Sequence, residues 1–414
     1  MSRFYFTTTM IAAFLLMSLA TVQPAIADIE NHGDEDEALT LQGVPVSLEA
    51  SEATAIEEVE LPVSETRVVT HKSLVSSAGY RFMSFDGYGG RAAEYEDLHS
   101  GPTFSLLSSI LGRDHKLVVD GAFITDNDYY ANLSYDYMGA YRFKLRSESL
   151  YHNLDRLALF APPFNLEGNS YTPVATDGGK LYGIRVEQDL AAMRARLGTY
   201  PIHLNLQYWR MVKEGNSQLR FSDQNFRAAN NSMYSSIRPV DLETHEGKVG
   251  FDAHLGPIDI IYDFTVRQFL NHNAVPRDIT SANGSAAGLN FISTTVLPYE
   301  HNEIPESSYY SHSVKLHTEQ TGGIVAAAAY TIARRENRSS LTQVRGANGL
   351  TDTLQSAAGD FVFTPSKEFS LALRFRHQEI DRDSATLVSQ EFLFNGASSF
   401  TVNKGINKQK DIVS

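Results

Sequence analysis

The chain has 414 residues, a formal net charge of −14 and no cysteine. The lack of cysteine excludes a disulfide framework, a Cys-ligated zinc or iron–sulfur site, a cysteine nucleophile and a c-type haem bound covalently to this chain. The acidic balance gives no electrostatic case for nucleic-acid binding, and the 23 Phe and 20 Tyr residues favour β-strands.

The first 27 residues have the pattern of a secretory signal peptide. Arg3 supplies one positive charge, residues 10–19 are apolar apart from Ser18, and Ala25 and Ala27 form a small-x-small cleavage site. A membrane anchor is the alternative, but the apolar core is shorter than the ~20 residues of a spanning helix. Export without cysteine predicts the periplasm or outer membrane of a Gram-negative bacterium.

Residues 28–66 form a second segment that carries nearly all of the net charge. It contains twelve acidic residues, no Lys or Arg and no aromatic residue, so it contributes −12 of the −14. Such a composition predicts a flexible segment. It is either a solvated tail or an anionic docking arm for a basic partner. The remainder, residues 67–414, is close to neutral.

In this remainder, apolar and polar residues alternate with the two-residue period of a β-strand. In residues 140–151, one side carries Tyr141, Phe143 and Leu145, and the other carries Arg142 and Lys144. Side chains alternate between the two faces of a strand, so the segment has an apolar and a charged face. Similar segments are 103–111, 116–125, 129–138, 181–197, 201–211, 247–255, 258–269, 308–319, 323–335, 353–364 and 368–380, with two less regular ones near 79–85 and 387–394.

The connections between these segments alternate in length. Short turns separate long polar loops at 152–180, 212–246, 270–306, 336–352 and 381–386, and only the early link at 126–128 breaks the rule. A soluble sandwich also alternates in polarity. Strands of about ten residues, with short turns at one rim and long loops at the other, instead favour a transmembrane antiparallel β-barrel of the outer-membrane type, with about 12–14 strands.

Two features depart from this regular pattern. Segment 181–197 changes the parity of its apolar positions, which we interpret as a β-bulge near Gln188 and Asp189. After Phe400 the sequence has no clean alternation and lacks a terminal aromatic residue. This indicates a truncated chain or an altered terminus, and missing strands would leave the barrel open.

No catalytic, cofactor or metal motif stands out, so we expect no enzymatic activity. The thirteen His residues are spread along the chain, and His312 and His317 fall on opposite faces of one strand. The strongest functional feature is a barrel lumen with both signs of charge, where the side chains either contact a ligand or merely keep the lumen wet. The lumen-facing candidates are Arg142, Lys144, Arg146, Glu148, Asp252, Asp259, Asp263, Arg374 and Arg376.

Several segments resemble the MtrB/PioB-type outer-membrane barrels of porin–cytochrome conduits. They are diffuse and spread over most of residues 79–380: RAAEY (91–95), LYHNLD (150–155), YPIHL (200–204), KEG (213–215), HSVKL (312–316) and FSLALRFR (369–376). The resemblance implies a barrel that holds a periplasmic multihaem c-type cytochrome in its pore, where it meets a surface cytochrome. Haem then resides only on the partners. Some members carry an N-terminal cysteine motif that this chain lacks, and family barrels are larger.

Three functions follow from these expectations. The first is a porin-like sheath in contact with outer-membrane lipid, which insulates a cytochrome for electron transfer across the membrane. The second is a general or substrate-selective diffusion porin. The third, an outer-membrane enzyme or adhesin using the long loops, has no candidate site in the sequence.

Overall fold

The computed structural model contains one compact unit from Thr66 to Ser414 to which all the strands below belong. The structure describes residues 70–87, 89–91, 93–157, 164–166, 169–175, 177, 182–222, 230–273, 277–278, 299–300, 304–318, 323–339, 344–345, 349–384, 387–392, 396–401 and 407–414. The predicted signal peptide and acidic segment lie outside these residues and stay predictions.

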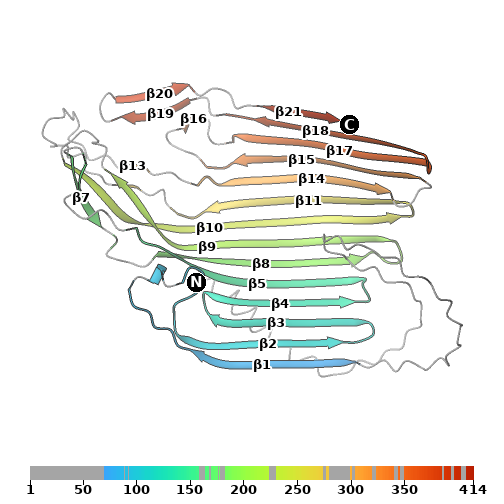
Figure 1. Cartoon of the computed structure of the whole chain (residues 1–414), viewed down its shortest axis with the longest axis horizontal. Coiled ribbons are helices and arrows are strands. Elements are labelled where there is room, and N and C mark those ends of the chain that lie inside the picture. Colours follow the sequence, from blue (N-terminus) through green and yellow to red (C-terminus); the bar gives the residue numbers. More distant parts are fainter. Residues whose placement is uncertain are drawn as a thin grey trace. The chain divides into compact units, whose positions relative to one another are not determined.

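The unit is built around one antiparallel meander sheet (Figure 1). Along the sheet the strands follow chain order: β1 (His71–Arg81), β2 (Gly101–Leu111), β3 (His115–Thr125), β4 (Asp128–Tyr137), β5 (Tyr141–Leu154), β8 (Tyr182–Arg196), β9 (Ile202–Ser222), β10 (Asn230–Leu255), β11 (Ile258–Asn271), β14 (Ser307–Thr318), β15 (Ile324–Asn337), β17 (Thr351–Ser366), β18 (Phe369–Arg382) and β21 (Lys408–Val413). These fourteen strands confirm the all-β antiparallel prediction. The sheet is open, because no pairing of the described residues joins β1 to β21.

Short elements accompany this sheet at the ends of the long connections. They are β6 (Phe164–Leu166), β7 (Asn169–Ala175), β12 (Arg277–Asp278), β13 (Tyr299–Glu300), β16 (Val344–Arg345), β19 (Leu387–Phe392), β20 (Gly396–Thr401) and the 3₁₀ turn η1 (Gly89–Arg91). β7 pairs in parallel with the start of β10. Among the described residues no helix is long and apolar enough to cross a membrane.

Tight turns join neighbouring strands at one rim of the sheet, which we call the short-turn rim. Between β4 and β5, Met138 and Gly139 have φ angles of 51° and 67°. Two successive positive φ angles define the primed turn that matches the twist of a hairpin. Gly198 and Gly256 have positive φ in the turns after β8 and β10. The longer connections leave from the other rim, the long-loop rim.

Most predicted strands appear with both ends within three residues of their expected positions, but β9 and β10 are much longer. The predicted loop 212–246 is wrong over most of its length. β9 runs on to Ser222 and β10 starts at Asn230, and they pair continuously from Met233↔Ser222 to Ala253↔Ile202. Alternation does not reveal the extension because both of its faces mix polar and apolar residues, so the period-two contrast disappears there.

The predicted bulge in β8 is also wrong. β8 pairs with β5 and with β9 in uninterrupted registers. The apparent change of parity instead reflects two environments along one straight strand. Tyr182 and Ile184 are apolar on one face near the long-loop rim, whereas Ala191 and Met193 are apolar on the other face near the short-turn rim.

Three expectations at the sheet edges need correction. The strand predicted near 79–85 is β1, which begins eight residues earlier. Its adjacent Leu74 and Val75 put apolar side chains on both faces, which blurs the alternation. The strand predicted at 387–394 pairs with β16 and β20 rather than with the main sheet. The irregular end of the chain, where alternation predicts no strand, forms β21 next to β18, and the predicted truncation stays a prediction.

The sheet buries few of its own apolar side chains. The buried hydrophobic residues are Val119, Tyr129, Leu133, Tyr182, Val212, Ala253 and Ala333. By contrast, Phe143, Val249, Phe251, Leu371 and Phe375 have between 38% and 50% of their surface exposed. Soluble proteins rarely expose contiguous apolar area on this scale, so the described surface requires an apolar covering from outside the sheet.

Candidate functional site: the charged face of the sheet

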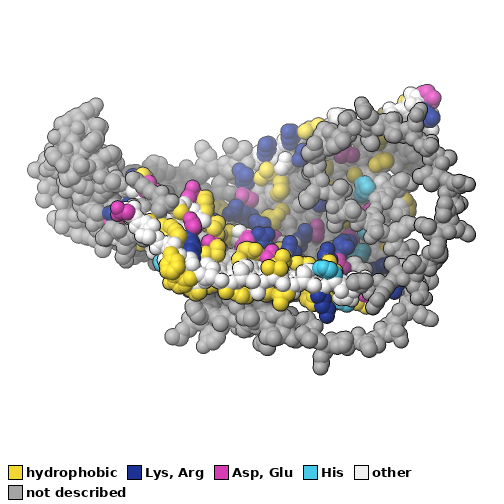
Figure 2. All heavy atoms as spheres, turned by 60° about the horizontal axis from the view of Figure 1, so that its bottom comes forward, with side chains coloured by type: hydrophobic (Ala, Val, Ile, Leu, Met, Phe, Trp, Pro, Cys, Tyr) yellow, Lys and Arg dark blue, Asp and Glu magenta, His cyan; other side chains and the backbone are white. Residues whose placement is uncertain are grey.

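The sheet carries its charges on one face, which we call the charged face. Residues directly opposite each other in an antiparallel pair share a face. Arg142 and Lys144 of β5 lie opposite Asp136 and Ser134 of β4 and opposite Arg194 and Ala192 of β8. Figure 2 shows Lys, Arg, Asp, Glu and His side chains gathered over the hollowed surface of the sheet.

Successive registers place all nine predicted residues on this face. β5 contributes Arg142, Lys144, Arg146 and Glu148, β10 and β11 contribute Asp252, Asp259 and Asp263, and β18 contributes Arg374 and Arg376. They do not form one site. Arg146 donates to Glu148 at 3.1 Å within its own strand. Arg374 of β18 donates to Asp360 of β17 at 2.6 Å on the same face, but near the β21 edge of the sheet.

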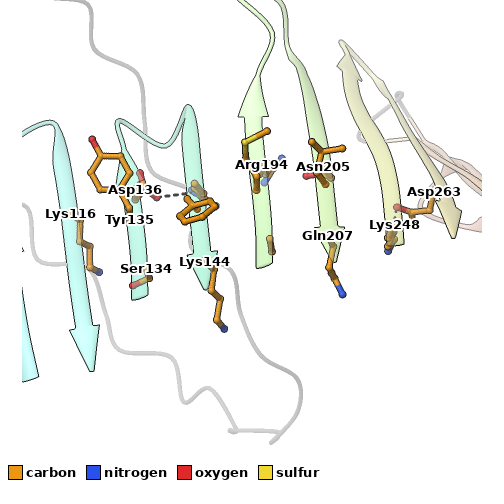
Figure 3. A pocket seen from close by; sticks show the side chains of 15 residues that line it. Lys116, Ser134, Tyr135, Asp136, Lys144, Arg194, Asn205, Gln207, Lys248 and Asp263 are labelled. Carbon is orange, nitrogen blue, oxygen red and sulfur yellow. Dashed lines mark hydrogen bonds and ion pairs between the residues drawn. The ribbon is translucent and has the colours of Figure 1, made fainter. Parts of the chain in front are cut away.

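A pocket of about 520 Å³ opens on the charged face between β3 and β11 (Figure 3). Its lining includes five cationic and two acidic side chains, namely Lys116, Arg142, Lys144, Arg194, Lys248, Asp136 and Asp263. They come from β3, β4, β5, β8, β10 and β11, which are six of the seven consecutive strands from β3 to β11. The pocket is therefore a positively charged part of a face that carries both signs.

Three of the five cations in the pocket are paired. Arg142 Nε lies 2.9 Å from Asp136 Oδ2, Arg194 lies 2.7 Å from Asp252 Oδ2, and Lys248 Nζ lies 3.3 Å from Asp263 Oδ1. Within the part of the chain that the structure describes, Lys116 and Lys144 have no acidic partner at ion-pair distance. These two ammonium groups are available to an anionic solute or an acidic surface.

Behind the pocket, on the opposite face, the strands form an apolar belt. On β10 it consists of Gly247, Val249, Phe251, Ala253 and Leu255, and on β11 of Ile258, Ile260, Tyr262, Phe264 and Val266. Nine residues span about 27 Å along a strand, or about 20 Å across a membrane when strands tilt by 35–45°. This height is close to the ~25 Å apolar band of membrane barrels.

The belt ends at a cluster of charges on the same face, which we call the Arg210 cluster. Arg210 donates to Glu243 at 2.7 Å, to Asp189 at 3.2 Å and to Glu187 at 3.3 Å. Ser147 Oγ donates to Asp189 at 2.7 Å. All four charged side chains are at most 18% exposed. These charges mark the level along the strands at which the face that carries the apolar belt becomes polar.

Beyond the Arg210 cluster, a segment of the loop between β1 and β2 is held at the long-loop rim by hydrogen bonds. Asp97 accepts hydrogen bonds from Thr125 Oγ1 and from Asn127 Nδ2. Although burial opposes ionisation, bonds from Thr125, His99 and Asn127 hold the pKa of the Asp97 carboxyl below its usual range. Asn153 Nδ2 donates to the Glu96 carbonyl at 2.7 Å. The short 126–128 link is thus covered by a neighbouring long loop.

One further group on the charged face consists of His203, Asp252 and His254, which the sequence pattern does not bring together. Potential ligand atoms of the three residues all lie within 4.8 Å of one another. Asp252 and His254 share a face because they are two residues apart on β10. That spacing is a weak signal by itself, and His203 joins them only through the β9–β10 register.

No family model matches the sequence, and no curated protein matches it. Solved structures of OmpT, an outer membrane protein of Vibrio cholerae, are similar at low score. The in-vitro folded form gives a TM-score of 0.29 at 7% identity and covers 81% of this chain and 93% of its own. The trimer form gives 0.27 at 8% identity, with 81% and 95% covered, and the outer-membrane expressed form gives 0.28 at 8%, with 81% and 93% covered.

Proposed function

We propose that this chain is the wall of a porin-like β-barrel in the bacterial outer membrane, where it encloses a multihaem c-type cytochrome for electron transfer across the membrane. The arrangement of the two faces is the observation that supports a membrane wall. The apolar belt and the charged pocket lie back to back on the same strand segments. A sheet that separates lipid from water needs one apolar and one polar face, and a closed barrel provides both without exposed edges.

Single-cysteine labelling tests the wall, because the chain has no native cysteine that would react. Phe143→Cys and Lys144→Cys place a thiol at neighbouring positions on opposite faces of β5. In lipid vesicles, a water-soluble maleimide should label position 144, and only a membrane-soluble reagent should label position 143. Val249→Cys and Lys248→Cys repeat the comparison on β10. Equal aqueous labelling within both pairs would contradict a membrane wall.

The partner proposed for the lumen is a multihaem c-type cytochrome. The lack of cysteine means that covalent c-type haem has to be supplied by periplasmic and surface cytochromes. A charged face with both signs suits contact with the surface charges of a folded protein. The sequence resemblance to MtrB/PioB-type barrels supports the same partner. In this proposal the chain holds no haem and catalyses no reaction, and its role is to insulate and position the conductor.

Purification of the full chain from its native membrane tests this part. We expect co-purification of proteins rich in Cys-x-x-Cys-His and the visible absorbance of haem. The alternative is a general or substrate-selective diffusion porin, which Lys116 and Lys144 favour because neither has an acidic partner among the described residues. A preparation with no haem protein and an open, anion-preferring conductance would replace the sheath with that porin, while the wall itself would stand.

A further inference from the structure

A row of histidine and aspartate side chains crosses four neighbouring strands at the short-turn rim of the charged face. His203 of β9 lies opposite Asp252 of β10, His254 of β10 lies opposite Asp259 of β11, and Asp259 lies opposite His317 of β14. Imidazole nitrogens and carboxylate oxygens are the ligand types of zinc and related divalent ions. The row therefore concentrates metal-ligand chemistry in one place.

Two distances in the row, both from Asp252 to an imidazole nitrogen, are close to those between the ligand atoms of one metal ion. Asp252 Oδ2 lies 3.0 Å from His203 Nδ1 and 3.5 Å from His254 Nε2. Ligand atoms about 2.1 Å from a tetrahedral metal lie about 3.4 Å from one another. The two measured distances fall on either side of this value. The ligand atoms of all three residues lie within 4.8 Å of one another, so side-chain rotation can bring the two imidazoles and the carboxylate around one ion.

Neighbouring groups orient two of these ligands. Asp259 Oδ1 lies 2.7 Å from His254 Nδ1, so a proton held there leaves Nε2 free to face Asp252. A carboxylate behind a metal-binding imidazole is the usual supporting arrangement at such sites. Asn205 Nδ2 donates to Asp252 Oδ1 at 2.6 Å, which leaves Oδ2 as the oxygen that faces both imidazoles.

We propose that His203, Asp252 and His254 bind a divalent transition-metal ion of the zinc class, with Asp259 as the residue that positions His254. Three protein ligands leave a fourth tetrahedral position open to water or to a partner's side chain. The His254 side chain is 50% exposed, which gives the ion a path from solution. This site does not depend on the nature of the barrel's partner.

Arg194 competes with the ion for this site. Its guanidinium donates to Asp252 Oδ2 at 2.7 Å and lies 3.2 Å from His203 Nδ1, so it neutralises the carboxylate in the absence of metal. A bound ion has to displace this contact. Arg194 is 34% exposed and can turn towards solvent. Its removal should therefore strengthen metal binding, which a purely structural ion-pair cluster would not show.

The test is titration of the full chain, folded in detergent, with Co²⁺ followed by visible absorption and with Zn²⁺ followed by calorimetry. We expect one saturable site with the absorption of tetrahedral Co²⁺. His203→Ala and His254→Ala should abolish it, Asp259→Asn should weaken it about 10–100-fold, and Arg194→Gln should tighten it about tenfold or more.

The matched control is His245→Ala, which removes an imidazole from the same strand but from the opposite face. It should leave the Co²⁺ spectrum and the Zn²⁺ affinity unchanged. Circular dichroism of each variant separates loss of ligands from loss of folding. No saturable site in either the wild type or Arg194→Gln would overturn the proposal, as would equal losses in His245→Ala and His254→Ala.

Discussion

The two halves of the long strands β8–β11 differ although the backbone pairing runs through both without interruption. The half near the short-turn rim is apolar on one face and charged on the other, with Phe251 and Val249 exposed in the belt. In the half near the long-loop rim the belt face carries the charged side chains of Arg210, Glu243 and Asp189. Hydrogen bonding alone therefore does not distinguish the halves, and side-chain chemistry does.

This difference indicates which part of the sheet would lie in lipid, namely the half near the short-turn rim. Lipid tails cannot solvate Arg210 and its three carboxylates, and water does not favour an exposed row of Phe, Val and Ile side chains. The boundary between the halves thus coincides with one interface of the proposed membrane. The strands continue past this interface as a paired ribbon, which explains why β9 and β10 are about twice as long as a membrane crossing needs.

The largest expected effect comes from removal of the charge that holds the long-loop half together. Arg210→Met would leave Glu187, Asp189 and Glu243 close together and without their shared cation. Loss of one partner from a largely buried ionic group costs about 3–5 kcal/mol of folding free energy. Urea unfolding in detergent would measure it. Arg374→Met is the control, because its pair with Asp360 is 71% and 53% exposed, and it should change nothing measurable.

The second effect tests the short-turn half. Phe251→Arg places a charge in the middle of the apolar belt and should cost about 2–4 kcal/mol for folding into lipid vesicles. Gln268→Arg places the same charge on the same face but beyond the belt, where the cost should be close to zero. Similar costs at both positions would remove the boundary between the halves and with it the proposed membrane interface.

The short-turn half is also the part of the fold that the sequence predicts well. Alternation in 140–151 assigns Phe143 and Lys144 to opposite faces, and the registers place them so. The signal is strong because one face there carries apolar side chains and the other carries charged ones. Towards the long-loop rim both faces carry polar side chains as well as apolar ones. The contrast vanishes there, so alternation predicts a loop beyond Met211 of β9 and before Gly247 of β10.

The side chains that meet across strands were less predictable than the strands. His203 and Asp252 lie almost fifty positions apart, and their contact depends on the register of a hairpin whose outer half has no hydrophobic period. The contact of Asp97 with Thr125 depends on how a loop folds back, which alternation does not encode. By contrast, the charged face required only the parity of Arg142, Asp263 and Arg376 within their own strands.

A third, smaller effect concerns function rather than stability. Lys144→Gln and Lys116→Gln remove the two pocket cations that have no acidic partner among the described residues. The folding free energy should change by less than about 0.5 kcal/mol, as is usual for exposed sites. In planar bilayers the reversal potential in a salt gradient should shift towards less anion preference. Lys72→Gln, on the opposite face of β1, should leave the reversal potential unchanged, and an equal shift would contradict a conducting charged face.

The smallest effect is the pH dependence that Asp97 contributes at the long-loop rim. Because the folded state holds the pKa of Asp97 below the ordinary value of about 3.9, ionised Asp97 stabilises the fold above that value. This contribution is lost as the pH falls through the lowered pKa. At pH 6 Asp97→Asn should melt about 2 °C below the wild type, and the difference should close below about pH 4. Asp86→Asn, an exposed change in the same loop, should show no such trend. A difference that stays constant with pH would mean that Asp97 supports the loop through its shape and neutral hydrogen bonds rather than through its charge.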